Sequence, residues 1–187
     1  MFARKCGWIA GLAVALLLPA LLPAQKLDLT KRFQIVARKD VDKVQKDLNK
    51  AGQNGLRIVT GSATAGDRVV LMLEKSKQKG ASYEYLVLSE SDPKKIEQRL
   101  SLGASQGFRL LPRTVTAKGK TLGGSDVVMV MEKGPGQTKT YEYLLLDTSL
   151  PSTLQVTLAG AVDKGYKVLT MVTRKKASFL ILEKAGK

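Results

Sequence analysis

The chain of 187 residues contains no histidine and only one cysteine, Cys6. The absence of histidine excludes Ser-His-Asp and Cys-His catalytic sites and any metal site with imidazole ligands. The single cysteine excludes a disulfide within one chain. Acidic residues are also few, with 16 Asp and Glu against 31 Lys and Arg and a net charge of +15. We therefore expect no cofactor and no metal ion, and we expect partners that tolerate or seek a basic surface.

Residues 1–24 have the pattern of a bacterial secretory signal peptide. Arg4 and Lys5 precede an apolar stretch over residues 7–18, and PALLPA (19–24) leads to a predicted cleavage site after Ala24. The alternative is an uncleaved membrane anchor over residues 7–24, which is near the lower length limit for a span. Prolines at 19 and 23 favour cleavage. We expect an exported protein, periplasmic or secreted, whose mature part keeps a net charge of +13, because the signal carries two bases and no acid.

The rest of the sequence repeats itself three times. Three segments begin alike, RFQIVAR (32–38), SYEYLVL (82–88) and TYEYLLL (140–146), and three later segments share a glycine and a base, NGLRIV (54–59), QGFRLL (106–111) and KGYKVL (164–169). Three apolar runs then end in Glu-Lys, at 69–75, 127–133 and 179–184. The central glycines, Gly55, Gly107 and Gly165, are separated by 52 and 58 residues. We predict three tandem units over 25–80, 81–137 and 138–187.

Each unit has the pattern of a β-α-β-β fold. The opening segment alternates in the manner of a strand, and an i, i+4, i+7 apolar stripe follows, as in Val44, Leu48 and Ala51. Asp40 and Asp92 precede two of the stripes as predicted N-caps. We expect an α+β protein in which each unit is a three-stranded antiparallel sheet, ordered first-third-second, with one helix. In the middle unit we expect a longer hairpin loop over 117–125.

Each unit also carries a base after its glycine and an acid near its end. The three sets are Arg57 with Glu74, Arg109 with Glu132, and Lys167 with Glu183. Residues that face each other in an antiparallel hairpin have a constant sum of residue numbers, so half of that sum marks the centre of the turn. For each of the three sets, this centre falls on a predicted turn or loop. We therefore interpret them as cross-strand ion pairs that fix the register, rather than as catalytic groups.

The first strands of the second and third units are apolar on both faces. A sheet with a helix on one side only should alternate apolar and polar residues, so the far face needs a cover. The hypothesis is that the three sheets share one core in a pseudo-threefold arrangement. Gln34 and Arg38 interrupt the second face in the first unit, which we expect at an edge or against a partner.

The segments YEYLVL (83–88) and LGASQGFRLL (102–111) resemble the small bacterial family called domain of unknown function 4177. The third unit resembles it through YEYLLL and GYKVL, and the first more loosely, with Leu56 where the family has tryptophan. The resemblance implies the β-α-β-β fold. It implies no activity and no catalytic residues.

Three functions remain open. The first is a non-catalytic binding or assembly module that meets an envelope protein. The second is a basic binder of anionic polymers or a membrane surface, with contacts from two lysine-rich clusters whose alternative role is solubility: Lys75, Lys77, Lys79, Arg174, Lys175 and Lys176. Aromatic residues are not interleaved with these bases, so we do not expect specific nucleic-acid recognition. The third, least favoured, is an enzyme of unrecognised type, because no clustered carboxylates indicate an active site.

Overall fold

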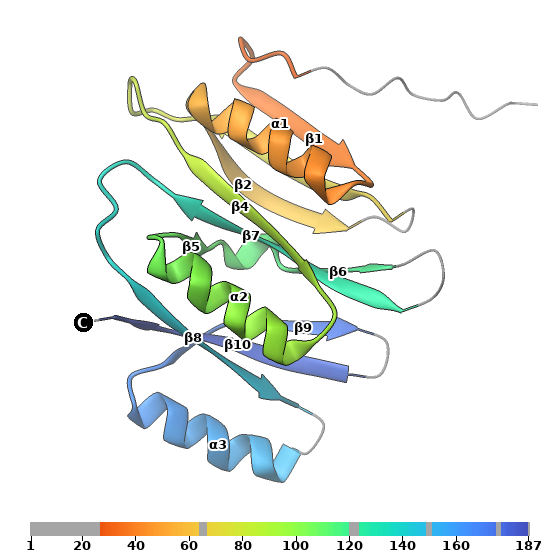
Figure 1. The fold of residues 1–187 in the computed structure, drawn as a ribbon, viewed down its shortest axis with the longest axis vertical. Coiled ribbons are helices and arrows are strands. Elements are labelled where there is room, and N and C mark those ends of the chain that lie inside the picture. The colour runs from red at the N-terminus through yellow and green to blue at the C-terminus, as the bar shows by residue number, and fades with distance from the viewer. Residues whose placement is uncertain (1–26, 64–66, 120–123, 149–150, 175–176, 187) are drawn as a thin grey trace, which may run out of the picture.

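The computed structural model describes residues 27–63, 67–119, 124–148, 151–174 and 177–186. The predicted signal peptide, Lys175 and Lys176 lie outside these residues. Within these residues the fold is mixed α+β, with three antiparallel sheets and three α-helices (Figure 1). In chain order the elements are β1 (Phe33–Arg38), α1 (Val41–Gln53), β2 (Leu56–Ala63), β3 (Val69–Lys75), β4 (Glu84–Glu90), α2 (Pro93–Ser105), β5 (Arg109–Leu110), a 3₁₀ turn η1 (Pro112–Thr114), β6 (Thr116–Gly119), β7 (Ser125–Lys133), β8 (Tyr141–Asp147), α3 (Pro151–Asp163), β9 (Lys167–Arg174) and β10 (Ala177–Ala185).

The helices begin and end at the residues that the sequence indicates. The Asp40 carboxylate accepts a hydrogen bond from the Asp42 backbone N–H, and the Asp92 carboxylate accepts from Lys94 and Lys95. Both predicted N-caps are therefore confirmed, since each satisfies amides that have no partner inside the helix. Shortly after each helix a glycine adopts a positive φ that other residues rarely reach, as at Gly107 (φ 86°).

The C-terminal strand of each sheet lies in the middle. The expected order, first-third-second, is found in the first sheet as β1-β3-β2. The other two sheets run β4-β7-β5, with β6 also paired to β7, and β8-β10-β9. The central position suits strands such as β7, whose residues 127–132 are all buried, because a central strand has no solvated edge and both of its faces can be covered.

The second sheet differs from the expected three strands. Its second strand is divided into β5 and β6, because Pro112 lacks the N–H that a continuous ladder needs. The η1 turn fills the gap with Thr114, whose hydroxyl oxygen accepts from Val130 N–H at 2.9 Å and lies 2.7 Å from the Leu111 carbonyl. The predicted long hairpin loop over 117–125 is also wrong at its ends, since 117–119 and Ser125 belong to strands.

We call a sheet and its helix a layer, so that layer 1 holds β1–β3 and α1, layer 2 holds β4–β7 and α2, and layer 3 holds β8–β10 and α3. We call the side of a sheet that carries its own helix the helix face, and the other side the back face. The layers follow one another along the long axis of the molecule (Figure 1). Helix α1 lies against β4 of layer 2 as well as against its own sheet, and α2 lies in the same way against β8.

This stack corrects the pseudo-threefold hypothesis. The back face of layer 2, with Tyr85 and Val87, packs into the core of layer 1, and the back face of layer 3, with Tyr143 and Phe179, packs into the core of layer 2. A third core holds layer 3 residues alone within the described part of the chain. The far faces are therefore covered in series rather than around one centre, and the first sheet lies at one end. No helix in the described ranges is long and apolar enough to cross a membrane.

Candidate interaction site

The strand registers place the predicted base and acid opposite each other in every layer. Arg57 faces Glu74, Arg109 faces Glu132, and Lys167 faces Glu183 across their ladders. The side chains nevertheless pair differently. Arg57 binds Glu132 of the next layer, and Arg109 binds Glu183 of the next layer.

The prediction of ion pairs within each hairpin is therefore wrong for both arginines. The physical reason is burial. Glu132 is only 4% exposed on the back face of layer 2 and cannot be left without a cation, whereas Glu74 is partly exposed and pairs with Arg32 of its own layer at 2.7 Å. An arginine side chain is long enough to reach the more deeply buried carboxylate in the neighbouring layer.

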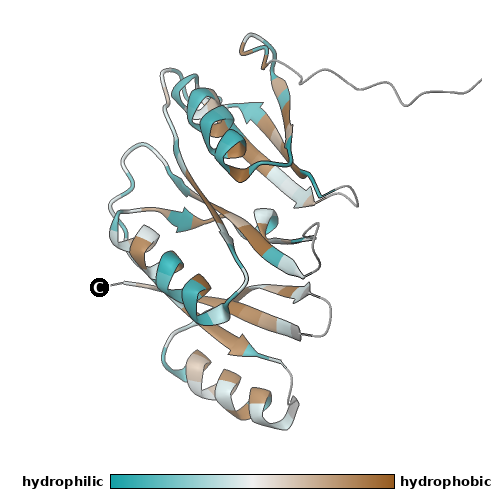
Figure 2. Cartoon of the chain, turned by 45° about the vertical axis from the view of Figure 1, so that its right-hand side comes forward, coloured by the Kyte–Doolittle hydropathy of each residue, from teal (hydrophilic) through white to brown (hydrophobic). Residues whose placement is uncertain are grey.

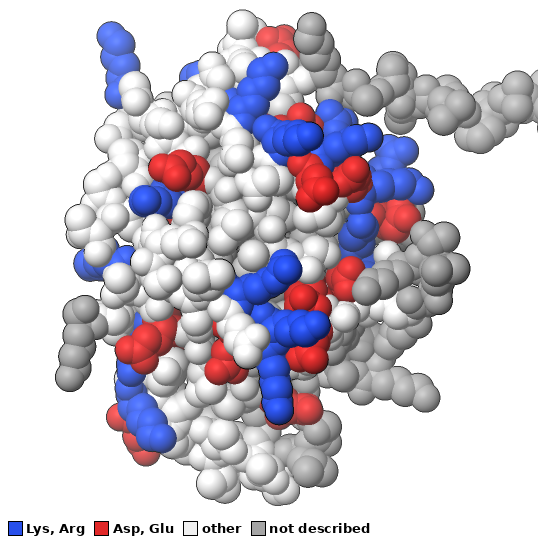
Figure 3. Space-filling view, viewed as in Figure 1, with Lys and Arg blue, Asp and Glu red and all other residues white. Residues whose placement is uncertain are grey.

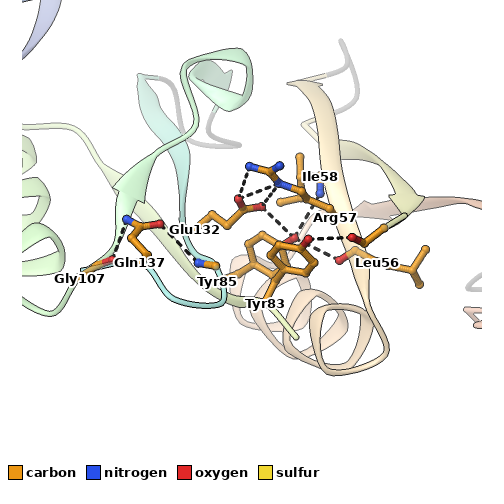
Figure 4. Close-up of polar contacts among 10 residues, drawn as sticks. Leu56, Arg57, Ile58, Tyr83, Tyr85, Gly107, Glu132 and Gln137 are labelled. Atoms are coloured by element: carbon orange, nitrogen blue, oxygen red, sulfur yellow. Dashed lines mark hydrogen bonds and ion pairs between the residues drawn. The ribbon is translucent and has the colours of Figure 1, made fainter. Parts of the chain in front are cut away.

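The first joint, between layers 1 and 2, is centred on Glu132 (Figure 4). Arg57 Nη2 lies 2.8 Å from Glu132 Oε1, and Arg57 Nε donates to both carboxylate oxygens, at 2.9 and 3.2 Å. The Tyr85 hydroxyl lies 3.2 Å from Glu132 Oε2 and 3.2 Å from the Leu56 carbonyl, and it accepts from the Ile58 N–H. One tyrosine thus joins the buried acid of layer 2 to the edge of the first sheet.

The second joint, between layers 2 and 3, repeats this geometry with residues that lie 51 to 58 positions later in the sequence. Arg109 Nε and Nη2 donate to the two oxygens of Glu183 at 3.0 and 2.8 Å, as a two-pronged contact. Tyr143 Oη lies 3.1 Å from Glu183 Oε2 and accepts from Leu110 N–H at 2.7 Å. In both joints the guanidinium also lies over a tyrosine ring of the next layer, Tyr83 or Tyr141. Arg57, Tyr85 and Glu132 therefore have direct equivalents.

The pKa shifts of the joint residues follow from their burial and from their contacts with the two buried acids. The hydrogen bond to Glu132 raises the pKa of Arg57, and the bond to Glu183 raises the pKa of Arg109. Burial, and then the adjacent carboxylate, raise the pKa of Tyr85 above its ordinary value, so its hydroxyl stays protonated and able to donate. The acids thus have their partners already, and neither joint presents a free base or nucleophile.

The described residues of the two predicted anion-binding clusters lie in different layers. Lys75 ends β3, and Lys77 and Lys79 follow it in the connection to β4, whereas Arg174 ends β9 in layer 3 (Figure 1). Lys75 and Lys77 line a shallow cavity of about 510 Å³ that Arg57, Arg113 and Glu74 also line. On the face shown in Figure 3, basic side chains are interspersed with acidic ones. The structure thus brings part of the first cluster together, and Lys175 and Lys176 of the second lie outside the described residues.

A further cavity of about 440 Å³ lies beside both joints, and Arg57, Arg109, Glu132, Lys139 and Tyr141 line it. It offers cations, but its arginines are already bound to the joint acids. Among the described residues, no three His, Cys, Asp or Glu side chains gather as metal ligands would.

The chain was compared with protein-family models, with curated proteins and with solved structures. No family model matches it. No curated protein and no solved structure matches it either. The function must therefore be argued from the geometry of this chain.

Sequence reasoning missed the tyrosines as joint residues. The Tyr-Glu-Tyr segments predict strands only. The tyrosine hydroxyls are the feature that could have indicated a polar contact there, since a buried tyrosine needs a polar partner. The registers also correct the alignment of the first strand, because Phe33, Tyr85 and Tyr143 are the residues that face Glu74, Glu132 and Glu183. Phe33 therefore occupies the place of the joint tyrosine in layer 1.

Proposed function

We propose that this chain is a non-catalytic binding or assembly module that acts outside the cytoplasm, built from three tandem β-α-β-β units of the kind found in domain of unknown function 4177. One observation carries the proposal. The conspicuous charged groups are used to hold layers together, while the two ends of the stack expose large apolar side chains such as Phe33 at 49% and Met171 at 61%.

The apolar ends support binding because exposed apolar surface on a folded protein usually marks a contact surface. The predicted signal peptide supports a location outside the cytoplasm. The internal repetition supports a scaffold rather than an enzyme, because both joints use the same residue types for the same structural purpose.

An apolar fluorescent dye tests this proposal. We expect anilinonaphthalene sulfonate to bind the folded, monodisperse protein, and the combined Phe33→Ser and Met171→Ser changes to remove most of the fluorescence gain. The matched control is Leu102→Ser, because Leu102 is also 61% exposed but lies on α2, away from both ends. A folded protein that does not bind the dye would overturn the proposal.

A second candidate function is the binding of anionic polymers. It is favoured by the cavity where Arg57, Lys75, Lys77 and Arg113 surround a single acid, Glu74. If this cavity binds polyanions, changing Lys75 and Lys77 together to glutamine should lower the salt concentration at which the protein leaves a heparin column. The control is the double change of Lys43 and Lys46 to glutamine on exposed α1 positions, which removes the same charge. Equal effects of both changes would indicate attraction by net charge alone.

A further inference from the structure

The two ends of the stack are the two halves of a joint. At one end, the back face of layer 1 presents Phe33 and Ile35, which are 49% and 41% exposed. The equivalent residues of layer 2, Tyr85 and Val87, are 3% and 9% exposed, because layer 1 covers them. The back face of layer 1 is therefore the surface on which a preceding layer would lie.

At the other end, no further layer among the described residues covers the helix face of layer 3. Val168 is 48% exposed, whereas its equivalents Ile58 and Leu110 are 8% and 1% exposed inside the joints. Met171 lies beside it in β9 and is 61% exposed. This face is the surface on which a following layer would lie.

Helix α3, at the same end of the stack, also has a more apolar surface than the other two helices. It contains no charged residue before Asp163, whereas α1 and α2 both carry several. Val162 on α3, at the place of Gly52 and Ala104, is 51% exposed, whereas those two residues are buried inside the joints. Figure 2 shows α3 largely in white and brown, while α1 is mostly teal. An exposed helix without charge is costly in water and suits a surface that becomes covered.

The polar groups of a joint are also divided between the two ends. Lys167 holds the position of Arg57 and Arg109, two residues after the glycine, and Glu74 holds the position of Glu132 and Glu183. The helix contact is present as well. Gln45 of α1 bonds to both Tyr85 O and Val87 N of the next layer, and Gln155 occupies the same place in α3 and is exposed.

We propose that the helix face of layer 3 docks on the back face of layer 1 in a second copy of this chain, so that the stack continues head to tail. The proposal rests on the proposed function and names the partner of the assembly module. It follows from continuity, because the same face-to-back contact is made twice within each molecule. An interface of this kind joins two different surfaces and does not close on itself by necessity, so it can add further copies.

The contact between copies is weaker than the internal joints. Phe33 lacks the hydroxyl of Tyr85 and Tyr143, and Arg32 already pairs with Glu74 in the isolated chain. That pair is exposed, so its exchange for Lys167 costs little. Copies of a chain with net charge +15, or +13 after the predicted cleavage, also repel one another, and added salt screens this repulsion. Assembly should therefore be reversible and should increase with protein concentration and with moderate salt.

Sedimentation velocity over a wide concentration range tests the proposal. We expect the mean mass to rise with concentration beyond that of one chain. Ile35→Glu at one end and Met171→Glu at the other should each keep the protein monomeric. Leu102→Glu is the matched control, because it places the same charge on an equally exposed apolar residue of α2 and should assemble as the unchanged protein does.

Mixing the two end variants gives the decisive result. Each variant keeps one intact end, so the mixture should form a species of two chains and no larger one. Circular dichroism and the thermal midpoint establish that each variant is folded, and Phe33→Glu and Val168→Glu replace any variant that is not. Loss of assembly with only one end variant would indicate a symmetric dimer and would overturn the proposal. A monomer at every concentration and salt level would also overturn it, while dye binding by that monomer would leave the proposed function standing.

Discussion

The two joints share their charged centre and differ in how closely the helix approaches the next layer. In the first joint, α1 approaches the start of β4 at Gly52, where an added Cβ would clash with the carbonyl oxygen of Tyr83, the residue before that strand. In the second joint the equivalent residue is Ala104, which is buried and accommodates a Cβ. Gln45 makes two hydrogen bonds to β4, and Glu97 at the equivalent place accepts one from Leu145 N–H.

The comparison separates what a joint requires from what it tolerates. Arginine, glutamate and tyrosine occupy the same places in both joints, because a buried carboxylate needs both a cation and a hydrogen-bond donor. The helix contact varies, because its separation from the next sheet can follow the size of one side chain. The strongest way to break the similarity is therefore to remove a cation, and the sharpest way to expose the difference is to change the small helix residue.

Removing the arginine of either joint should give the largest loss of stability. Arg57→Leu leaves Glu132 buried without its cation, and Arg109→Leu does the same to Glu183. We expect each change to lower the free energy of unfolding by about 2–4 kcal/mol, because an uncompensated buried charge is costly. Denaturant unfolding followed by circular dichroism measures the loss.

The control for this prediction is Arg32→Leu, which removes the cation from the more exposed Glu74 and should cost about 0.5 kcal/mol or less. Equal losses from Arg32→Leu and Arg57→Leu would show that burial of the acid does not determine the strength of a joint. Changing Arg57 and Glu132 together to leucine should recover most of the loss, because no charge then remains buried.

The small residue of α1 should distinguish the two joints. Gly52→Ala forces α1 away from the Tyr83 backbone, and we expect it to cost about 1–3 kcal/mol. Gly160→Ala on α3 is the matched control, because an added Cβ there meets nothing within 4 Å. That change should stabilise the protein by about 0.5–1 kcal/mol through helix propensity. Thermal unfolding measures both, and a stabilising Gly52→Ala would contradict the close approach.

Alkaline pH should weaken both joints through their tyrosines. Burial raises the pKa of Tyr85 and Tyr143 above the ordinary value of 10.0, so the folded state keeps these hydroxyls protonated while the unfolded chain loses its protons. The contribution of these two tyrosines to the free energy of unfolding is fully present below pH 10. It falls as the pH rises further, by up to about 1.4 kcal/mol per pH unit for each tyrosine. Unfolding measured from about pH 9 to about pH 11 should therefore show a smaller slope when both residues are changed to phenylalanine. An unchanged slope would mean that the decline comes from other groups, such as the lysines.

Much of the architecture could be predicted from the sequence, and the partners in the joints could not. Periodicity and caps are local signals, so the three helices and the glycines after them were accessible. The opposition of Arg57 and Glu74 follows from ladder arithmetic. The choice of Glu132 by Arg57 depends on the relative burial of two acids in different layers, which no single unit contains. The break after Leu110 had a visible cause in Pro112, whose missing N–H prevents a continuous second strand.

The helix contacts give the smallest expected effect and a local measurement. Gln45→Ala removes an amide that accepts from Val87 N–H and donates to the Tyr85 carbonyl, both at 2.7 Å. We expect about 1–2 kcal/mol for this change and less for Glu97→Ala, which removes a single bond of 3.2 Å. Amide hydrogen exchange resolves the two, because Val87 should exchange faster in the first variant and Leu145 in the second. If exchange at Leu145 N–H accelerated as much in Glu97→Ala as exchange at Val87 N–H does in Gln45→Ala, the closer approach of α1 would not make the first joint the tighter one.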